Sequence, residues 1–337
     1  MDSPSVSVIV TNWNGKHLLP LCLESLRGQR FRSFRTLLVD NGSTDGSVDF
    51  VRRRYPEVTV IPLHRNTGFA VANNRALETV STPYAALLNN DAEADPRWLL
   101  SLVDALERHP PAGFAASKMV FLDQPATVDR AGDGYTVAGA AFLRGRGAPS
   151  DAYSREEWVF GACAGAALYR MSMLREIGFF DEDFFILCED VDLSFRAQLR
   201  GYRCIFVPGA VVRHGWASTI GRDSPPSVFY GHRNVEWVYV KNMPSRLIFR
   251  TILPHVIYDI AAFLYFLIRG RGGVFAKAKM EALGGLGKMF AKRRKIQRLR
   301  SVPEGDLWKS MDREMFWKRR IAAERPGERG TGAEGEA

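Results

Sequence analysis

Three short polar segments of this sequence bring together side chains that could hold a nucleotide or a metal ion. They occupy residues 11–14, 40–43 and 89–91, and each follows a short apolar run. Asp91 closes the third segment, Asn-Asn-Asp, and a carboxylate at that position can hold a divalent cation against a diphosphate. The structural alternative is that Asp91 only caps a turn.

A fourth segment, Glu-Asp-Val-Asp at residues 189–192, concentrates acidic side chains that could accept a proton. Acidic residues also favour helix N-termini for electrostatic reasons, so the segment could simply begin a helix. However, the Phe-rich sequence FFDEDFFI precedes it, and buried acids need a partner or a chemical role. His214 adds an imidazole in the sequence VVRHGW, although a single histidine is more often a structural residue.

The elements that must position these groups alternate in type along the first third of the chain. Apolar, β-branched runs predict strands at 6–10, 36–39, 58–61 and 84–88, and helices are expected at 18–27, 47–54 and 69–80. This alternation indicates a mostly parallel sheet with helices on both faces. Ligands bind beyond the carboxyl ends of the strands in such sheets, which is where the three polar segments lie.

The remaining elements are less regular. Asp95 is expected to cap a helix that Pro96 opens, while the Gly- and Ala-rich residues 132–154 are expected to form a loop or flexible insert. The small residues at 161–167 suit a close approach of backbone or ligand. A helix at 189–199, a strand at 203–207 and helices from 227 to about 320 complete the prediction.

Composition and missing motifs exclude several classes of protein. The chain has 337 residues, of which 46% are hydrophobic and 25% charged, as expected for a folded protein of two structural units. No G-x-G-x-x-G follows the first strand and no G-x-x-x-x-G-K-[ST] occurs, which argues against dinucleotide and P-loop sites. The four cysteines form no C-x-x-C pair, so we expect reduced thiols in the cytoplasm and no zinc knuckle.

The positive charge is concentrated in one part of the chain. The net charge is +9, but residues 241–300 hold 14 Lys and Arg against 2 acids, so this stretch carries +12 and the rest −3. A near-neutral body with one basic, apolar-rich stretch indicates an anionic membrane surface rather than nucleic acid. The apolar residues 251–268 would cover about 27 Å as a helix, short of the ~30 Å hydrocarbon core.

That apolar stretch also contains Pro254, His255 and Asp259, which favours a helix lying on the membrane interface over one that spans it. The N-terminus has an acid where a signal peptide needs basic residues, so we expect no signal sequence. The predicted organisation is a catalytic domain at 1–242, a basic amphipathic helical region at 243–322 and a disordered tail at 323–337.

Taken in order, several segments resemble the family 2 glycosyltransferases of the GT-A fold, in particular bacterial rhamnosyltransferase-like members. The resemblance rests on VSVIVTNWNG, LLVDNGSTDGS, RNTGFAVANNRAL, LLNNDAEADPRWL, GACAGAALYRMSML, GFFDEDFFILCEDVDLSFRAQLRGYR and VVRHGWAST, followed by YGHRN. These segments lie between residues 5 and 242, about 70% of the chain. The implied fold is α/β, with a mostly parallel central sheet, helices on both faces and a C-terminal helical region that associates with membranes.

The resemblance implies donor-binding roles by position. Thr11 and Trp13 would line the nucleotide base, on which Trp13 could stack. Asp40 would accept a hydrogen bond from the edge of the base. Asn66 and Gly68 would lie near the ribose and the diphosphate.

The resemblance also implies a metal site. Asp91 matches the last acid of the family's D-x-D motif, and His214 matches a position that can complete the metal shell, so Mg²⁺ or Mn²⁺ is the expected cofactor. Asn90 is expected to bind substrate beside them. The triplet has one carboxylate where the family has two or three, because Asn89 and Asn90 are amides.

The implied catalytic base is Asp190, with Glu189 beside it to hold the acceptor or the base. The small residues at 164–167 would face the acceptor. A phosphate would meet the polar side chains of Tyr230, Arg233 and Asn234.

These roles predict an inverting glycosyltransferase that moves a sugar, rhamnose in the best-matched subfamily, from a nucleotide-diphosphate donor. The expected donor is dTDP-rhamnose, and the base pocket would also admit a UDP-sugar. The expected acceptor is a hydroxyl of a lipid-linked or cell-envelope glycan, carried on polyprenyl diphosphate at the cytoplasmic face of the cell membrane. The alternative is a catalytically silent, membrane-associated scaffold of the same fold, and no nucleic-acid partner is expected.

Overall fold

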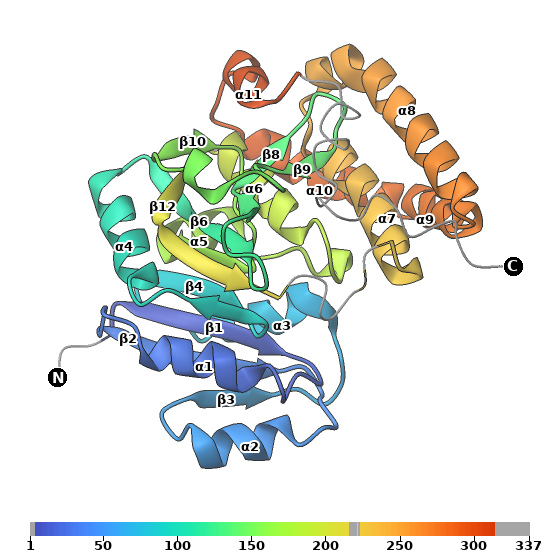
Figure 1. Cartoon of the computed structure of the whole chain (residues 1–337). Coiled ribbons are helices and arrows are strands. Elements are labelled where there is room, and N and C mark those ends of the chain that lie inside the picture. The colour runs from blue at the N-terminus through green and yellow to red at the C-terminus, as the bar shows by residue number, and fades with distance from the viewer. Residues whose placement is uncertain (1–3, 216–220, 222, 314–337) are drawn as a thin grey trace, which may run out of the picture.

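The computed structural model describes residues 4–215, 221 and 223–313, and a central sheet organises most of them (Figure 1). Its strands are β1 (Val6–Asn12), β2 (Phe34–Asp40), β3 (Thr59–Pro62), β4 (Tyr84–Asn89), β5 (Ala92–Ala94), β6 (Ala112–Phe121), β7 (Val128–Ala131), β10 (Glu157–Val159), β11 (Ala166–Arg170) and β12 (Arg203–His214). The helices around it are α1 (Leu19–Arg27), α2 (Ser47–Arg54), α3 (Gly68–Leu77), α4 (Trp98–Arg108), α5 (Met171–Ile177) and α6 (Glu189–Leu199).

The sheet is mixed but mostly parallel, as the alternation of strands and helices predicted. Its order is β10-β12-β6-β11-β4-β1-β2-β3, with β5 paired to β12 and β7 paired to β6. Strands β3, β2, β1 and β4 are mutually parallel, and so are β6 and β12. Between these two parallel groups lies β11, which is antiparallel to both of its neighbours.

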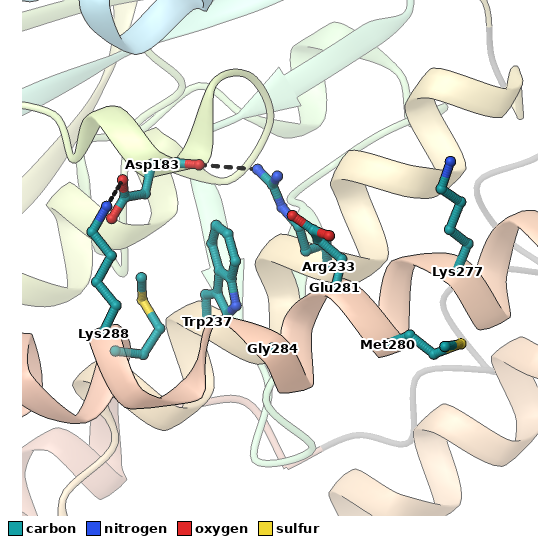
Figure 2. Close-up of a pocket in the computed structure, with 10 residues that line it drawn as sticks. Asp183, Arg233, Trp237, Lys277, Met280, Glu281, Gly284 and Lys288 are labelled. Carbon is teal, nitrogen blue, oxygen red and sulfur yellow. Dashed lines mark hydrogen bonds and ion pairs between the residues drawn. The ribbon is translucent and has the colours of Figure 1, made fainter.

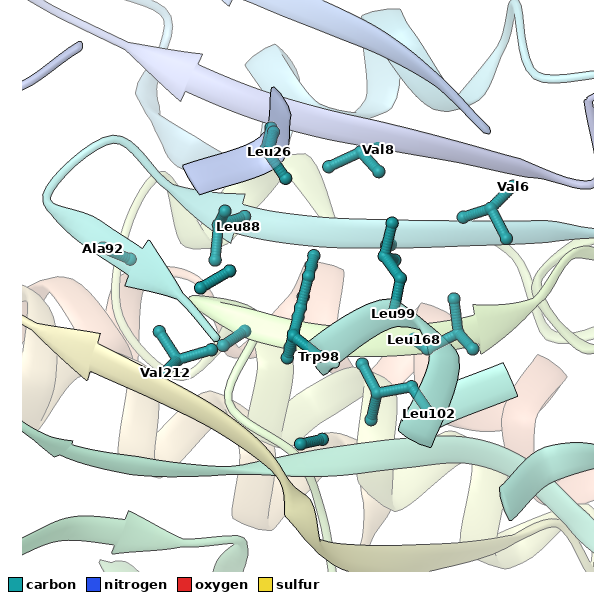
Figure 3. Close-up of a cluster of buried hydrophobic side chains, with 14 of the residues drawn as sticks. Val6, Val8, Leu26, Leu88, Ala92, Trp98, Leu99, Leu102, Leu168 and Val212 are labelled. Atoms are coloured by element: carbon teal, nitrogen blue, oxygen red, sulfur yellow. The ribbon is translucent and has the colours of Figure 1, made fainter. Parts of the chain in front are cut away.

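Two apolar layers cover the sheet, because successive side chains of a strand point to opposite faces. In β1, Val6, Val8 and Val10 pack with α1, α2 and α4 on one face, where Trp98 lies at the centre of the cluster (Figure 3). Ile9 points to the other face and packs with α3, α5 and α6. The polar ends of the strands are therefore held on a rigid, fully covered scaffold.

Residues 132–154 are not the loop that their glycine content predicted. They contain a hairpin of β8 (Asp133–Tyr135) and β9 (Ala141–Leu143), followed by a short 3₁₀ turn at Ser150–Ala152. Tyr135 is buried, and its ring stacks on Phe160 with centroids 5.1 Å apart. Gly134 belongs to this packing, since a Cβ there would collide with the ring of Phe142.

Two boundaries also differ from the prediction. Helix α4 begins at Trp98, and the Asp95 carboxylate caps the preceding turn by accepting from the Arg97 N–H at 2.9 Å, so Pro96 lies outside the helix. Strand β12 continues past residue 207 to His214, because a bulge between Val207 and Val211 accommodates Pro-Gly without ending the strand.

The C-terminal helices form a layer beside α6 (Figure 1). They are α7 (Pro225–Asn242), α8 (Ser245–Ile268), α9 (Gly272–Gly284), α10 (Leu286–Leu299) and α11 (Glu304–Ser310). Buried side chains of α7, among them Trp237 and Val238, pack with Phe195 of α6 and Met289 of α10. Residues 314–337, which include the predicted tail at 323–337, lie outside the described part of the chain.

Helix α8 is longer than the apolar stretch predicted at 251–268. Within the described residues it is the one helix long and apolar enough to cross a membrane by length and composition. One face of it is exposed and apolar, from Phe249, which is 84% exposed, through Leu253 and Ile260 to Ile268. The opposite face packs against protein and includes the buried His255.

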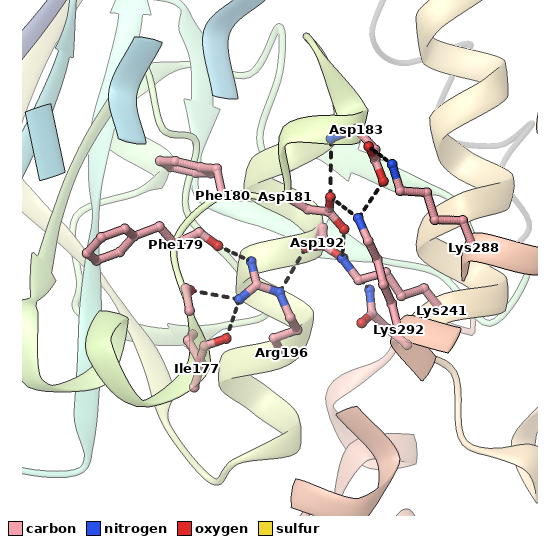
Figure 4. Close-up of polar contacts among 12 residues, drawn as sticks. Ile177, Phe179, Phe180, Asp181, Asp183, Asp192, Arg196, Lys241, Lys288 and Lys292 are labelled. Carbon is pink, nitrogen blue, oxygen red and sulfur yellow. Dashed lines mark hydrogen bonds and ion pairs between the residues drawn. The ribbon is translucent and has the colours of Figure 1, made fainter. Parts of the chain in front are cut away.

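The strongest basic cluster of the stretch expected to meet anionic lipids lies on and just after α10, at residues 292–295 with Arg298 and Arg300, and not all of it faces solvent. Lys292 forms ion pairs with Asp181 and Asp183 (Figure 4). Arg293 is buried and donates to the carbonyls of Val240 and Met243. These two side chains therefore hold the layer together, and the exposed cations of the cluster are Arg294, Lys295 and Arg298.

Candidate active site

The polar segments that follow β1, β2 and β4 meet at one edge of the sheet, as the strand order requires. Asn12 joins them: its Nδ2 donates to Asp40 Oδ1 at 3.1 Å, and its Oδ1 accepts from Asn90 Nδ2 at 2.8 Å. The other oxygen of Asp40 accepts from the Ser43 N–H at 2.9 Å. The predicted donor-site residues Asp40 and Asn90 are thus brought together in one buried network.

The two residues expected to line a nucleotide base differ in exposure. Trp13 is 43% exposed at the end of β1, so its indole face is available for stacking on a base. Thr11 is half-buried and donates to Asn73 Oδ1 on α3 at 3.1 Å. Asn12 lies between them in the sequence, and the sequence analysis had not singled it out as the centre of the network.

Asn66 and Gly68 shape the start of α3 beside this edge. Asn66 Oδ1 accepts from the Gly68 N–H at 2.9 Å and from Asn41 Nδ2 at 3.1 Å. Gly68 has a φ of +85°, and a Cβ there would lie 2.5 Å from the carbonyl oxygen of Phe185. Only glycine fits where these two chain segments cross, so Gly68 permits a close approach of backbone to backbone.

Asp91 and His214 meet as a pair, although 123 positions separate them in the chain. Antiparallel pairing of β12 with β5 sets His214 opposite Ala92, next to Asp91. The distance between His214 Nε2 and Asp91 Oδ1 is 3.3 Å, and Nδ1 of the same ring lies 3.0 Å from Asp129 Oδ2. Burial lowers the pKa of His214, but the two carboxylates outweigh burial and raise it from 6.5 to about 9.

This pair has the chemistry and spacing of a divalent-metal site. Two ligands on adjacent corners of an ion, each about 2.1 Å from it, lie about 3 Å apart, close to the Asp91–His214 distance. Asp129 completes a carboxylate–imidazole arrangement behind the ligand, which is a common way to orient a metal-binding histidine. Asp129 was not predicted from the sequence; the pairing of β7 with β6 brings it beside His214.

Glu189 and Asp190 are the first two residues of α6, and their side chains differ in burial and in hydrogen bonding. Asp190 is half-buried, and its Oδ2 accepts from the Ala164 N–H at 3.2 Å in the small-residue segment. Glu189 is buried, and its Oε2 has no hydrogen-bond partner among the described residues. Burial and the charge of Asp190 raise the pKa of Glu189 well above its usual range, which favours the neutral form of this carboxyl group.

A buried ion pair lies near Asp190. Arg130 Nη1 is 3.4 Å from Asp133 Oδ1, and both side chains interact electrostatically with Asp190. Burial raises the pKa of Asp133 to about 7, while Arg130 opposes this shift. Neither residue was singled out from the sequence, because both lie at the edge of the stretch expected to be a flexible insert.

Arg233 lies on α7, away from the network at the strand ends, and lines a cavity of about 750 Å³ with Trp237, Lys277 and Lys288 (Figure 2). Its Nη2 donates to the carbonyls of Asp183 and Phe184 at 3.0 Å. Asn234 is fully buried, so the expected contact of this side chain with a phosphate is wrong. Tyr230 stacks on Phe185 with ring centroids 5.1 Å apart.

A second group of potential metal ligands, Glu236, His255 and Asp259, lies between α7 and α8. Lys279 pairs with both carboxylates there, at 2.7 Å from Asp259 Oδ1. His255 Nδ1 lies 2.8 Å from the carbonyl oxygen of Ala138, so that nitrogen donates and carries a hydrogen. A lysine ammonium already balances this group, which we interpret as an ion-pair cluster that joins the helices.

Comparison with known proteins identifies the family. The model of the family described as Glycosyl transferase family 2 matches residues 7–178. The N-acetylglucosaminyl-diphospho-decaprenol L-rhamnosyltransferase of Mycobacterium tuberculosis is 30% identical over 271 residues, which cover 71% of this chain and 84% of the relative. The O-antigen biosynthesis protein RfbC of Myxococcus xanthus is 29% identical over 68% of this chain, which corresponds to 18% of that protein.

Solved structures agree on the fold. The mannosyltransferase PcManGT of Pyrobaculum calidifontis, solved with GDP-Man and Mn²⁺, superimposes with a TM-score of 0.56 at 18% identity, covering 96% of this chain and 86% of that one. S. aureus TarS 1-349 in complex with UDP-GlcNAc gives a TM-score of 0.56 at 16% identity, with 91% and 92% covered. With its mixed, mostly parallel sheet of the GT-A type, the chain belongs to glycosyltransferase family 2 and is a hexosyltransferase.

Proposed function

We propose that this enzyme transfers rhamnose, with inversion, from a nucleotide-diphosphate donor to a hydroxyl of a glycan carried on polyprenyl diphosphate. The observation that carries the proposal is the grouping of Trp13, Asp40, Asp91 and His214 at one edge of the sheet. The activity for which the mycobacterial relative is named supports both the sugar and the lipid-linked acceptor. The donor we favour is dTDP-rhamnose, and a UDP-sugar is the second choice.

The donor would lie across the ends of β1, β2 and β4. Trp13 would stack on the base, with Thr11 and Asp40 beside it. Asp40 already accepts hydrogen bonds from Asn12 and Ser43, so its part in base recognition would be to fix the shape of this pocket. The ribose and diphosphate would follow toward Asp91.

Mg²⁺ or Mn²⁺ would be held by Asp91 and His214, with Asp129 orienting the imidazole. When bound, the ion neutralises charge on the departing nucleoside diphosphate. PcManGT, solved with Mn²⁺, provides an example of a similar fold with this ion. The amides of Asn89 and Asn90 are weaker ligands for a hard cation than a second carboxylate, so oxygens of the donor diphosphate would be needed as further ligands.

The acceptor hydroxyl would attack the anomeric carbon of the sugar from the side opposite the diphosphate. The carbon–oxygen bond to the acceptor forms as the bond to the diphosphate breaks, and this single displacement inverts the anomeric centre. Asp190 would take the hydroxyl proton. We assign the base to Asp190 rather than Glu189, because the Glu189 side chain is buried whereas Asp190 is half-buried beside the small-residue segment, and burial raises the pKa of Glu189.

We further propose that the enzyme acts while bound peripherally to the cytoplasmic leaflet, with the exposed face of α8 in the interface. Phe249, Leu253 and Ile260 lie along this face, and the inward face of the same helix packs against protein through Thr251 and His255. A helix with one face committed to protein fits an in-plane position. Arg294, Lys295 and Arg298 supply exposed positive charge for anionic lipids.

The test of the reaction uses purified full-length enzyme, dTDP-rhamnose or UDP-sugars, and a synthetic polyprenyl-diphospho-glycan, with and without Mn²⁺. Transfer should occur with one donor and should fall by at least about 10²-fold in Asp190→Asn, while dTDP binding is retained, because only the proton acceptor is removed. Near wild-type turnover by Asp190→Asn would remove this residue from the base role. Tight donor binding without any transfer would favour the silent scaffold.

Membrane attachment is tested separately on isolated membranes. Carbonate or high-salt washing should release the protein if it is peripheral. Retention after alkaline extraction would instead mean that α8 spans the bilayer, and failure to bind anionic vesicles at all would contradict the membrane proposal.

A further inference from the structure

The turn that leads into the catalytic helix has an unusual backbone. Phe185, Leu187 and Cys188 all have positive φ angles, at 62°, 67° and 66°, and none of them is glycine. Left-handed conformations at such residues cost about 1–3 kcal/mol each, so surrounding contacts must hold them in place. The turn ends at Cys188, the N-cap of α6, and Asp190 is the second residue of that helix.

One side chain contacts three carbonyl groups of this turn. Asn234 of α7 is 0% exposed, and its Nδ2 approaches the carbonyl oxygens of Phe184, Ile186 and Leu187 at 3.0, 2.9 and 2.6 Å. Its Oδ1 accepts from Arg233 Nε at 2.9 Å, which fixes the orientation of the amide. The carbonyl groups of a turn with left-handed residues thus converge on a single amide nitrogen.

The same turn also contacts the donor side of the site. The carbonyl oxygen of Phe185 accepts from the N–H groups of Phe69 and Ala70, at 2.6 and 3.3 Å, in the first turn of α3. Gly68 permits this crossing, as described above. The turn therefore lies between α7 on one side and the beginning of α3 on the other, with Asp190 directly after it.

We propose that Asn234 is a positioning residue: by holding the carbonyls of Phe184, Ile186 and Leu187 it fixes the turn that sets Asp190 against the acceptor. The proposal rests on the proposed role of Asp190 as the base. Asn234 touches no reacting atom in this account. Its contribution is to keep the turn in a conformation that the residues of the turn would not adopt by themselves.

The test compares Asn234→Ala and the isosteric Asn234→Asp, which replaces the donating amide by oxygen, with the control Gln29→Ala. Gln29 is a buried amide of the opposite layer that bonds the backbone of Ser25, Asp95 and Leu99, so its loss removes a similar number of contacts far from the turn. Each variant is assayed well below its unfolding midpoint. The readouts are kcat, KM for dTDP-rhamnose, and amide hydrogen exchange of the 181–192 segment.

Both Asn234 variants should lose about 10²-fold in kcat, the size expected for a displaced catalytic group, with KM for the donor changed far less. Exchange in the 181–192 segment should increase in these variants and not in Gln29→Ala. If Asn234→Asp does not fold, the alanine variant carries the comparison. Unchanged exchange in this segment, or a kcat no lower than that of Gln29→Ala, would overturn the proposal. Absence of transfer by the wild-type enzyme would refute the proposed donor, and the exchange data would still decide whether Asn234 holds the turn.

Discussion

Replacing His214 by glutamine should remove much of the loss of folding stability that occurs above neutral pH. In the folded protein the imidazolium lies between Asp91 and Asp129, which raise its pKa to about 9 against an ordinary value of 6.5. The folded state therefore binds this proton more tightly than the unfolded state does. The resulting stabilisation is complete below pH 6.5, decreases as the pH rises toward 9, and is absent above it.

The expected magnitude follows from the same values. Each pKa unit corresponds to about 1.4 kcal/mol, so His214 should contribute about 3 kcal/mol at pH 6 and almost nothing above pH 9. Asp133 also has a raised pKa, about 7 against an ordinary value of 3.8. The stabilisation that its proton provides is therefore lost as the pH rises from about 4 through 7. Because Asp133 is present in both proteins, the difference between wild type and His214→Gln separates the histidine from this carboxyl group.

The assay is urea unfolding followed by tryptophan fluorescence at a series of pH values, with a chelator present so that no metal competes for the imidazole. The wild-type free energy of unfolding should fall by about 1.4 kcal/mol per pH unit as His214 deprotonates. The curve of His214→Gln should be much flatter, and His17→Gln, which changes an exposed histidine, should follow the wild type. Parallel curves for wild type and His214→Gln would refute the reasoning.

Three other outcomes are expected. Asp129→Asn should weaken Mn²⁺ binding about 10–100-fold in a calorimetric titration, because the orienting partner of His214 is lost; equal affinity would remove Asp129 from the metal site. Lys241→Met should lower the free energy of unfolding by about 3 kcal/mol in urea, since Asp181 and Asp192 each lose one of two cationic partners in a buried ion-pair network; a loss below 1 kcal/mol would contradict this. Leu253→Glu combined with Ile260→Glu should abolish flotation with anionic vesicles while leaving the thermal midpoint unchanged, because both side chains are exposed; undiminished flotation would exclude this face.

The grouping of the donor-site residues was predictable because it depends on a rule of parallel sheets. Once β1, β2 and β4 are recognised as parallel neighbours, their carboxyl ends must meet, and Asp40 and Asn90 must lie near each other. Asn12, which links them, belongs to the same segment as Thr11 and Trp13. The local sequence pattern was sufficient to predict this grouping, because each of these polar residues ends or directly follows one of the three strands.

Asp129 could not be found in this way. Its contact with His214 depends on two strand pairings, β7 with β6 and β6 with β12, neither of which local sequence specifies. The hairpin at β8 and β9 was missed for a related reason. Tyr135 is buried by rings from distant parts of the chain, Phe160 and Phe195, and glycine content gives no indication of such long-range packing.

The sequence also could not show which positive charges of the C-terminal helices face solvent. Lys292 and Arg293 are adjacent to Arg294 and Lys295 in the sequence, and only the position of α10 decides which of them face the protein. Lys292 reaches Asp181 and Asp183 in the segment before the catalytic helix, which Lys241 and Arg196 also hold (Figure 4). A basic run whose sequence predicts lipid binding therefore contains two residues, Lys292 and Arg293, that make contacts within the protein instead.

The contacts that hold the turn before α6 and the proposed membrane surface on α8 belong to one connected layer of helices. Asn234 of α7 holds the turn, Trp237 of the same helix donates to the carbonyl of Ala282 on α9 at 3.1 Å, and Lys279 of α9 pairs with Asp259 of α8. The exposed face of α8 is therefore rigidly related to Asp190 through buried contacts rather than through a flexible linker. The proposed function, with an acceptor anchored in a bilayer and Asp190 as the base, would need such a relation, because the height of Asp190 above the lipid surface would determine which hydroxyl of the glycan it reaches.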